Sequence, residues 1–472
     1  MKTVLAFDFG ASTGRAIKAV FDGKKISYEE IHRFENIPKT VEGHVCHDVQ
    51  MIFGEIKAAI EKAGKVDSIA FDTWGVDYAL LDKEGKIIHE PYHYRDERTK
   101  DALGKAFEKK SADEIYAETG NQIMNINTLF QLTSDGNLEN ADKLLFMPDL
   151  FSYLLTGEKV CEASIASTSQ MLDLKSGRWS KRVLDTFGIK EELFPELKAS
   201  ATVNGYYNGI PVISVAGHDT QCAVAAMPAV SENAAFLSCG TWSLIGCELD
   251  SPVMTEKSNA LELSNEMGAN GKINFLKNIS GLWLIQETRR DLAETDRKYS
   301  YNELEMLARE SEAFRSFIDP DAPELSAHGK LPDKIRAYCK KTGQPVPETT
   351  GQLVRCIYES LAMKYRLALT QITECTGKSF DVLHLMGGGT KDGFLCELTA
   401  QSLGIPVVAG PIEATALGNI VLQLIALGEI ESIEEGRKII AENERVKAFE
   451  EKHTPDWDEA FERFCRLLNA KK

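Results

Sequence analysis

The stretch that decides the fold reads V-L-A-F-D-F-G-A-S-T-G-R and spans residues 4–15. Its first four residues are all apolar, which is typical of a strand buried on both faces of a sheet. The strand ends at Asp8, and a turn rich in glycine and hydroxyl residues follows. Successive N–H groups in such a turn can bind an anion, and an adjacent carboxylate can hold a divalent cation. The stretch therefore predicts half of a nucleotide-phosphate site, with an ordinary hairpin turn as the alternative.

The length and composition of the chain exclude several classes of protein. With 472 residues the chain is too long for one ordinary core, so two or more domains are expected. It has 54 basic and 71 acidic side chains, and the net charge of −17 argues against nucleic acid or an anionic membrane as a partner. No run of eighteen apolar residues occurs and the N-terminus leads directly into a strand, so we expect neither a membrane span nor a secretory signal.

Ten cysteines are scattered along the chain without a C-x-x-C pair. This distribution argues against a disulfide framework or a structural zinc site and favours a cytoplasmic protein. Cys339 and Cys356 could pair if a helical hairpin brought them together, but two free buried thiols are the favoured interpretation. The oligomeric state is left open, and a homo-oligomer is compatible with the sequence.

The hydrophobic pattern predicts mixed sheets flanked by helices. Strands over 16–21 and 25–34 follow the first turn, and an amphipathic helix over 48–63 comes next. The arrangement of strand, glycine turn and strand returns at 234–249, which indicates a weak internal duplication. We therefore expect an α/β protein with two domains, residues 1–245 and residues 246–472, and a ligand in the cleft between them.

Three glycine-rich turns are candidates for binding a nucleotide, because neither a P-loop nor a strand-linked dinucleotide fingerprint occurs. Gly10–Gly14 and Gly240–Thr241 each join two strands and would contact phosphates through backbone N–H groups. The third turn, G-G-G-T-K at 387–391, follows a buried strand and would let a ring or a ribose lie against bare backbone. A tight strand-to-helix turn is the alternative there, and we favour binding.

The segment G-H-D-T at 217–220 contains the candidate catalytic base. Asp219 follows a buried strand and could accept the proton of a substrate hydroxyl as that oxygen attacks a phosphoryl group. A helix N-cap is the alternative role for this carboxylate. His218 and Thr220 could hydrogen-bond the same substrate, although a purely structural role is equally favoured for the histidine.

The segment D-T-W-G-V-D at 72–77 is a candidate for sugar binding. Trp74 could supply an apolar wall for a sugar face, with core packing as its alternative, and Gly75 could expose its backbone to the substrate. The charged segment Y-R-D-E-R-T at 94–99 is interpreted as an ion-paired structural loop.

A second candidate for ligand binding is N-I-S-G-L-W-L-I-Q at 278–286. If the whole segment is helical, Asn278 and Gln286 lie about two turns apart on one face. The asparagine could then donate to the sugar and the glutamine to the nucleotide.

The order of these motifs resembles that of the FGGY carbohydrate kinases, from Val4 to about Gly428. The motifs are D-F-G-A-S-T-G-R, D-T-W-G-V-D, G-H-D-T, C-G-T-W-S, K-N-I-S-G-L-W-L-I-Q, G-G-G and G-P-I-E-A-T-A-L-G-N. The resemblance implies two domains of the actin-like ATPase (ribonuclease H-like) fold that close over ATP and a ketose. The second and third motifs resemble those of members that phosphorylate L-rhamnulose at O1. The alternatives are a kinase for a related deoxyketose such as L-fuculose, or an actin-like ATPase that is not a kinase.

The resemblance also implies roles for individual residues. Asp219 matches the catalytic base of the family, and Asp8 matches the acid associated with Mg²⁺. Many members carry threonine where this chain has Ala11. The remaining implied contacts are with ATP for Ala11, Ser12, Thr13, Gly14, Arg15, Thr241, Gln286 and Gly388, and with the sugar for Gly75, His218, Asp219, Thr220 and Asn278.

Overall fold

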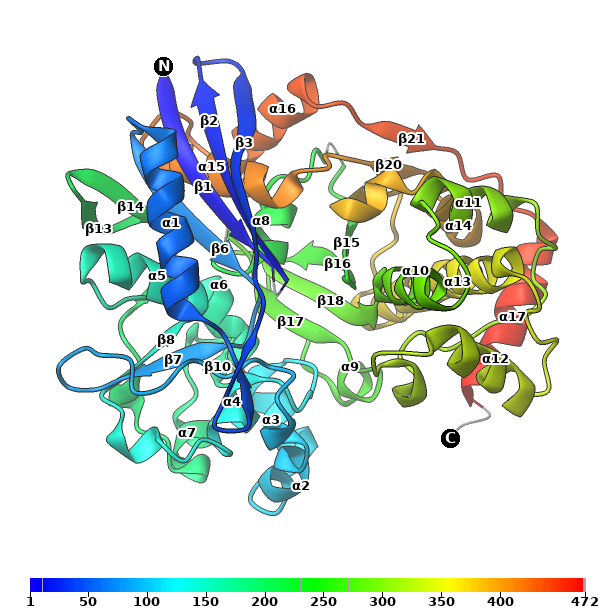
Figure 1. Cartoon of the computed structure of the whole chain (residues 1–472), viewed down its shortest axis with the longest axis horizontal. Helices are drawn as coiled ribbons and strands as arrows, with labels where there is room; N and C mark the ends of the chain where they lie inside the picture. The colour runs from blue at the N-terminus through cyan, green and yellow to red at the C-terminus, as the bar shows by residue number, and fades with distance from the viewer. Residues whose placement is uncertain (11, 230, 270, 470–472) are drawn as a thin grey trace. The chain divides into compact units, whose positions relative to one another are not determined.

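The structure is a computed structural model that describes residues 1–10, 12–229, 231–269 and 271–469. Its internal contacts divide the chain into two units, whose elements are labelled in Figure 1. Unit 1 comprises Met1–Pro228, Glu248–Phe275 and Ala414–Asn443, and unit 2 comprises Ala229–Cys247, Leu276–Glu413 and Glu444–Lys472. This division differs from the single boundary expected near residue 245. The reason is tertiary, because the late helix α15 (Ala414–Ala426) packs on strands from the start of the chain.

Unit 1 contains a six-stranded mixed sheet in the order β13-β14-β6-β1-β2-β3. Strand β1 pairs antiparallel with β2 and parallel with β6, which is also parallel to β14. The carboxyl ends of β1, β6 and β14 therefore lie at the same edge of the sheet. The six strands are β1 Lys2–Phe9, β2 Thr13–Phe21, β3 Ile26–Glu35, β6 Ser68–Thr73, β13 Thr202–Tyr207 and β14 Ile210–Ser214.

Helices and short strand pairs complete unit 1. Its helices are α1 Val49–Ala63, α2 Ala102–Phe107, α3 Ala112–Thr119, α4 Thr128–Leu132, α5 Met147–Thr156, α6 Ala163–Ala166, α7 Lys181–Phe187, α8 Asp219–Ala225, α9 Glu256–Ala260, α15 and α16 Ile433–Asn443. Its shorter strands are β4 Lys39–Val41, β5 His44–Cys46, β7 Tyr78–Leu81, β8 Lys143–Phe146, β9 Cys161–Glu162, β10 Leu172–Asp173, β11 Arg178–Trp179, β12 Leu197–Lys198 and β17 Ser264–Met267.

Both faces of the unit 1 sheet are buried along the central strands β1 and β6, as the apolar run at the start of the chain predicted. Leu5 and Phe7 belong to a hydrophobic cluster with α1 and α5, whereas Ala70 and Ile213 belong to a cluster with α8 and α15. Helix α1, which lies along the sheet in Figure 1, begins after Asp48, whose carboxylate accepts a hydrogen bond from the third helical N–H. The sequence predicted this helix correctly because its cap and its periodicity are both local.

Unit 2 contains most of a second mixed sheet, whose full order is β17-β18-β16-β15-β19-β20-β21. Strand β15 is antiparallel to β16 and parallel to β19, which is parallel to β20. Its strands are β15 Ala234–Cys239, β16 Trp242–Leu249, β18 Ile273–Ser280, β19 Val382–Met386, β20 Val407–Ala409 and β21 Lys447–Phe449. Its helices are α10 Trp283–Thr295, α11 Tyr301–Arg309, α12 Leu331–Lys341, α13 Thr350–Thr376, the 3₁₀ helix η6 Gly388–Lys391, α14 Gly393–Leu403 and α17 Pro455–Asn469.

The two sheets repeat one strand order, which confirms the predicted duplication of pattern. In unit 1 the order is β3-β2-β1-β6-β14, and in unit 2 it is β18-β16-β15-β19-β20. In each unit an antiparallel hairpin leads into a parallel crossover, and a long helix precedes the second parallel strand. The architecture is therefore a pair of α/β units built on the same plan.

Two expectations about the whole chain are also answered by the structure. No helix among the described residues is long and apolar enough to cross a membrane. Cys339 and Cys356 are free buried thiols, and the hydrogen bond to Cys356 is the largest cause that lowers the pKa of the Cys339 thiol.

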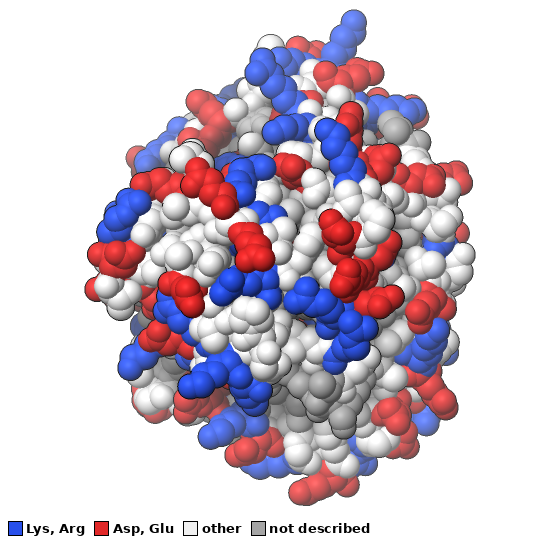
Figure 2. Space-filling view, turned by 90° about the vertical axis from the view of Figure 1, so that its right-hand side faces the viewer, with Lys and Arg blue, Asp and Glu red and all other residues white. Residues whose placement is uncertain are grey.

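On the described part of the face drawn in Figure 2, acidic and basic side chains are interspersed and no continuous basic patch forms.

Candidate functional site

Three adjacent strand ends in unit 1 bring the candidate catalytic residues together. Asp8 on β1 lies opposite Asp72 on β6 in the parallel register, and Thr73 on β6 forms a parallel bridge with His218 beyond β14. Open α/β sheets bind ligands beyond the carboxyl ends of their strands. The structure thus gathers Asp8, His218 and Asp219 from sequence motifs that lie far apart.

The carboxylate of Asp219 remains accessible although many groups surround it. Its side chain is 33% exposed, and its Oδ1 accepts a hydrogen bond of 2.6 Å from the backbone N–H of Thr220. Asp219 is the first residue of α8, and His218 occupies the N-cap position, so the N-cap alternative for Asp219 is wrong. Burial is the main cause that raises the pKa of Asp219; His218 lowers it and Asp8 raises it further. A carboxylate with a raised pKa that solvent can reach suits a general base.

His218 lies between two carboxylates. Its Nδ1 is 3.0 Å from Oε2 of Glu266 on β17, and its Nε2 is 3.5 Å from Oδ1 of Asp219. Burial by itself lowers the pKa of His218, but Glu266, Asp219 and Glu162 together raise it overall. The histidine therefore combines a structural partner on one side with a position beside the candidate base on the other. Glu266 was missed because S-N-E-M carries no local signal of a site.

Asp8 forms an ion pair with Arg15, its cross-strand neighbour on β2. The pair is largely buried, since the side chains are only 10% and 19% exposed. The resemblance implies a contact with ATP for Arg15 and an association with Mg²⁺ for Asp8. The ion pair shows that Arg15 also neutralises the charge of Asp8. The two predicted residues are brought together by the antiparallel register of one hairpin.

The turn between β1 and β2 is closed by a hydrogen bond of 2.8 Å from the N–H of Gly10 to the carbonyl of Thr13. Gly14 is required by packing, because a Cβ at this position would lie 2.1 Å from the ring of Phe34. Ser12 and Thr13 are exposed, so their hydroxyl groups are available to a ligand. Ala11, the remaining residue of the predicted phosphate turn, lies outside the described residues.

The segment after β6 is held tightly rather than left open. Trp74 is only 7% exposed, and its indole N–H donates a hydrogen bond of 2.9 Å to the buried Asp77, which favours core packing over a sugar wall. Gly75 packs closely, since a Cβ there would lie 3.3 Å from Thr168. Val76 has a φ of +69°, an unusual conformation for a β-branched residue and a sign of local backbone strain.

In unit 2 the glycine turns and Gln286 approach one another. The hydroxyl of Thr241 is 3.4 Å from Oε1 of Gln286, and the N–H of Gly281 donates to the carbonyl of Thr241 at 3.0 Å. These residues lie at the carboxyl end of β15, beside the end of β19 from which Gly388 follows. Thr241 and Gln286 are therefore close neighbours, as a shared role in nucleotide binding requires.

The three consecutive glycines after β19 have different reasons to be glycine. Gly387 has a φ of +83°, and a Cβ on Gly389 would lie 2.3 Å from Sγ of Cys239. Gly388 has no such constraint, because its nearest neighbour would be a carbonyl oxygen of Cys239 at 4.0 Å. Chain packing thus explains two of the glycines, and Gly388 offers open backbone to a ligand.

The helix expected over 278–286 is wrong. Asn278 belongs to strand β18, whereas Gln286 belongs to helix α10, so the two side chains do not share one helix face. The break falls at Gly281, where a Cβ would lie 2.4 Å from Oγ of Ser243. The sequence does not show β18 as a buried strand, because polar residues such as Asn274 and Lys277 are buried along it and break up the apolar run.

The described residues offer a limited donor set for a metal ion. No group of three or more His, Cys, Asp or Glu side chains among them could hold a metal by itself. Asp8 supplies a hard carboxylate oxygen, which suits Mg²⁺ because this ion usually keeps several waters and binds substrate phosphates with only one or two carboxylates. The chain thus fits a metal carried mainly by a nucleotide.

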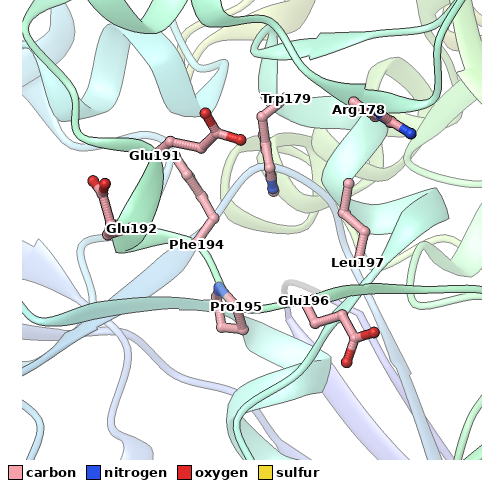
Figure 3. A pocket seen from close by; sticks show the side chains of 8 residues that line it. All are labelled: Arg178, Trp179, Glu191, Glu192, Phe194, Pro195, Glu196 and Leu197. Carbon is pink, nitrogen blue, oxygen red and sulfur yellow. The ribbon is translucent and has the colours of Figure 1, made fainter.

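A separate open pocket in unit 1 contains none of the predicted site residues. Trp179 and Phe194 stack there with their ring centroids 4.0 Å apart, and Arg178 with several glutamates surrounds them (Figure 3). The mixture of acids around one stacked aromatic pair has no counterpart in the motifs described above. The pocket is therefore distinct from the candidate catalytic site.

Comparisons with known proteins found similar sequences over nearly the whole chain. The C-terminal and N-terminal domain models of the FGGY family of carbohydrate kinases match residues 235–427 and 3–226. A rhamnulokinase of Bacteroides thetaiotaomicron is 42% identical, over 97% of this chain and 98% of its own length. A rhamnulokinase of Enterococcus faecalis is 38% identical, over 93% and 92% of the two chains.

Solved structures show the same fold at low sequence identity. The ligand-bound xylulose kinase of Lactobacillus acidophilus has a TM-score of 0.80 at 18% identity, with 100% of this chain and 98% of that one covered. The glycerol kinase of Plasmodium falciparum with ADP has a TM-score of 0.78 at 15% identity, with 100% and 97% covered. With both domain models matched and relatives similar over nearly their whole length, the chain belongs to the FGGY family of carbohydrate kinases.

Proposed function

We propose that this kinase transfers the γ-phosphoryl group of ATP to O1 of L-rhamnulose, giving L-rhamnulose 1-phosphate for L-rhamnose catabolism in the cytoplasm. Relatives that carry the name rhamnulokinase support this substrate, at 36–42% identity over most of the chain. The observation that carries the proposal is the accessible carboxylate of Asp219, which lies beside His218 at the ends of parallel strands.

In the proposed reaction Asp219 accepts the proton of the O1 hydroxyl as this oxygen attacks the γ-phosphorus. The O1–P bond forms, the bond between the γ-phosphorus and the bridging oxygen breaks, and ADP leaves. A positioned general base contributes roughly 10²- to 10⁴-fold to such a reaction. His218, Thr220, Gly75 and Asn278 would hold the ketose so that O1 faces the base.

The nucleotide would be bound by backbone and uncharged side chains, together with a small number of cations. Thr241, Gln286 and Gly388 in unit 2 would contact ATP, and the turn over 10–14 with Arg15 in unit 1 would contact its phosphates. Bound Mg²⁺ would offset negative charge on the phosphates, and Asp8 would hold it directly or through water. Binding through backbone groups and a few local cations suits a chain of net charge −17, because such a chain has no general positive field to attract a polyphosphate.

A substrate panel tests the proposal. ADP release would be measured with L-rhamnulose, L-fuculose, xylulose and glycerol, with and without Mg²⁺, and the product would be identified by ³¹P NMR. We expect the highest kcat/KM with L-rhamnulose and a strict need for Mg²⁺. A faster reaction with L-fuculose would reassign the substrate, and ATP hydrolysis that no ketose stimulates would contradict the proposed kinase reaction.

A further inference from the structure

Glu266 is a buried carboxylate aimed at the residue before the candidate base. It is only 5% exposed, and its Oε2 lies 3.0 Å from Nδ1 of His218. An ionised carboxylate can only accept hydrogen bonds, so the proton of this contact belongs to Nδ1. The opposite nitrogen of the same ring lies 3.5 Å from Oδ1 of Asp219. The three side chains thus form a carboxylate–imidazole–carboxylate row that ends at the base.

Two amide side chains fix the orientation of Glu266. Gln221, one turn beyond His218 in the chain, donates from Nε2 to Oε2 of Glu266 at 2.6 Å. Asn274 on β18 in turn donates from Nδ2 to Oε1 of Gln221, which leaves the amide nitrogen of Gln221 free to face the carboxylate. Both amides are almost completely buried, at 1% and 0% exposed. A network this buried holds its members in one arrangement.

We propose that Glu266 is a positioning residue that holds His218 protonated and oriented, so that a cationic imidazole lies beside Asp219 and keeps this base ionised. The inference rests on the proposed role of Asp219 and adds a residue that no motif assigns. A buried imidazole without a partner carboxylate would lose its second proton, because burial disfavours the charged form. Glu266 supplies the missing charge, and no proton needs to move between Glu266 and the substrate.

Other charged groups also act on the two titratable residues of this row, His218 and Asp219. Glu162, whose carboxylate accepts the N–H of Gly217 at 2.9 Å, also raises the pKa of His218. Asp8 raises the pKa of Asp219, while His218 lowers it. Asp8 is itself paired with Arg15, and His218, 3.5 Å from Asp219, is the neighbour whose charge lowers the pKa of the base. Loss of the charge on His218 would therefore leave Asp219 among carboxylates.

The test replaces Glu266 with glutamine and follows the pH dependence of the full-length enzyme. The acid limit of kcat/KM reports the ionisation of Asp219. In Glu266→Gln the pKa of His218 should fall, so this residue carries less charge near the acid limit and the pKa of Asp219 should rise. The acid limit of kcat/KM should therefore move up by about one pH unit. Glu266→Asp keeps the charge and should reverse at least part of this shift.

Selective ¹⁵N-histidine labelling provides a readout that needs no activity. The His218 resonances, assigned by comparison with His218→Asn, should titrate at lower pH in Glu266→Gln than in the unsubstituted chain. This measurement separates the inference from the proposed function, because it would succeed even if L-rhamnulose were not the substrate. An unchanged His218 titration, or a kcat that falls equally at every pH, would overturn the inference and leave Glu266 a structural residue.

A matched control is available in the same unit. Asp135 is another buried carboxylate beside a histidine, with Oδ2 3.5 Å from Nε2 of His89. Neither Asp135 nor His89 is among the groups that shift the pKa of His218 or Asp219. Asp135→Asn should therefore lower thermal stability without moving the acid limit of kcat/KM. If this variant also raised the acid limit, the effect of Glu266→Gln would be attributed to general destabilisation and the inference would fail.

Discussion

The ends of β1 and β6 in unit 1 and of β15 and β19 in unit 2 hold equivalent places in one strand order, but they carry different chemistry. In unit 1 Asp8 lies two positions before Gly10 and pairs with Asp72, and in unit 2 Ser238 lies two positions before Gly240 and pairs with Met386. Carboxylates gather at the first edge, whereas uncharged side chains and bare glycine backbone form the second. The repeated fold thus provides the position, and the residues at the strand ends decide between acid–base chemistry and close contact with a ligand.

The variant with the largest expected effect on this contrast is Asp219→Asn in unit 1. We expect turnover to fall by about 10³-fold, because a positioned base is removed, while ketose affinity stays within a few-fold. Steady-state kinetics and calorimetric ketose binding check both parts, and a thermal unfolding curve checks the fold. Retained turnover in a stable variant would remove Asp219 from its proposed role.

The corresponding test in unit 2 compares two neighbouring glycines. Gly389→Ala places a Cβ against Cys239 and should lower the free energy of unfolding by about 1–3 kcal/mol, through overpacking. Gly388→Ala has room for its methyl group, so its stability should be unchanged while the KM for ATP rises roughly tenfold. Denaturant unfolding and ATP kinetics separate the two effects. An unchanged KM in Gly388→Ala would argue that the nucleotide does not approach this backbone.

A third test concerns Asp72, the buried acid opposite Asp8, because the equivalent pair in unit 2 is the uncharged Ser238 and Met386. Burial, and then the charge of Asp8, raise the pKa of Asp72 well above 3.8, so the folded state keeps this proton at a pH where the unfolded chain has lost it. Stability linked to Asp72 is therefore present below about pH 4 and declines as the pH rises through the folded pKa. Asp72→Asn cannot ionise, so it should gain about 1 kcal/mol relative to the unsubstituted chain between pH 5 and pH 8. The denaturation midpoints of Asp72→Asn and of the unsubstituted chain would be measured at pH 5 and at pH 8. If the two proteins had the same midpoint at both pH values, ionisation of Asp72 would not destabilise the folded state.

The smallest expected effect concerns the N-caps of the helices that precede the second parallel strand of each unit. Asp48 caps α1 and Thr349 caps α13, and each side chain accepts a hydrogen bond from a backbone N–H of the first turn. Replacing either with alanine should cost about 1 kcal/mol of unfolding free energy. Asp48→Asn and Thr349→Ser keep the acceptor and should restore most of it. A larger loss for Asp48→Ala would reflect its additional contact with Lys39, at 3.1 Å.

Local signals account for the parts of the fold that were predicted correctly. The run from Val4 to Phe7 identified a strand buried on both faces, and glycine turns marked the two hairpins. Helix α13 followed from its periodicity over 350–376, because each turn repeats the same apolar face. The single helix predicted over 278–286 is wrong, because this segment contains the end of a strand, a glycine turn and the start of a helix.

The sequence by itself determined the α/β class and the repeated hairpin plan, since each depends on neighbours within a few positions, and its motifs supplied the candidate site residues. Only the tertiary structure decided that α15 belongs to unit 1, that Trp74 is packed and that Glu266 faces His218 from 48 positions away. Such contacts depend on which surfaces meet when strands and helices pack. No local pattern encodes them, because burial and charge act on residues through space rather than along the chain.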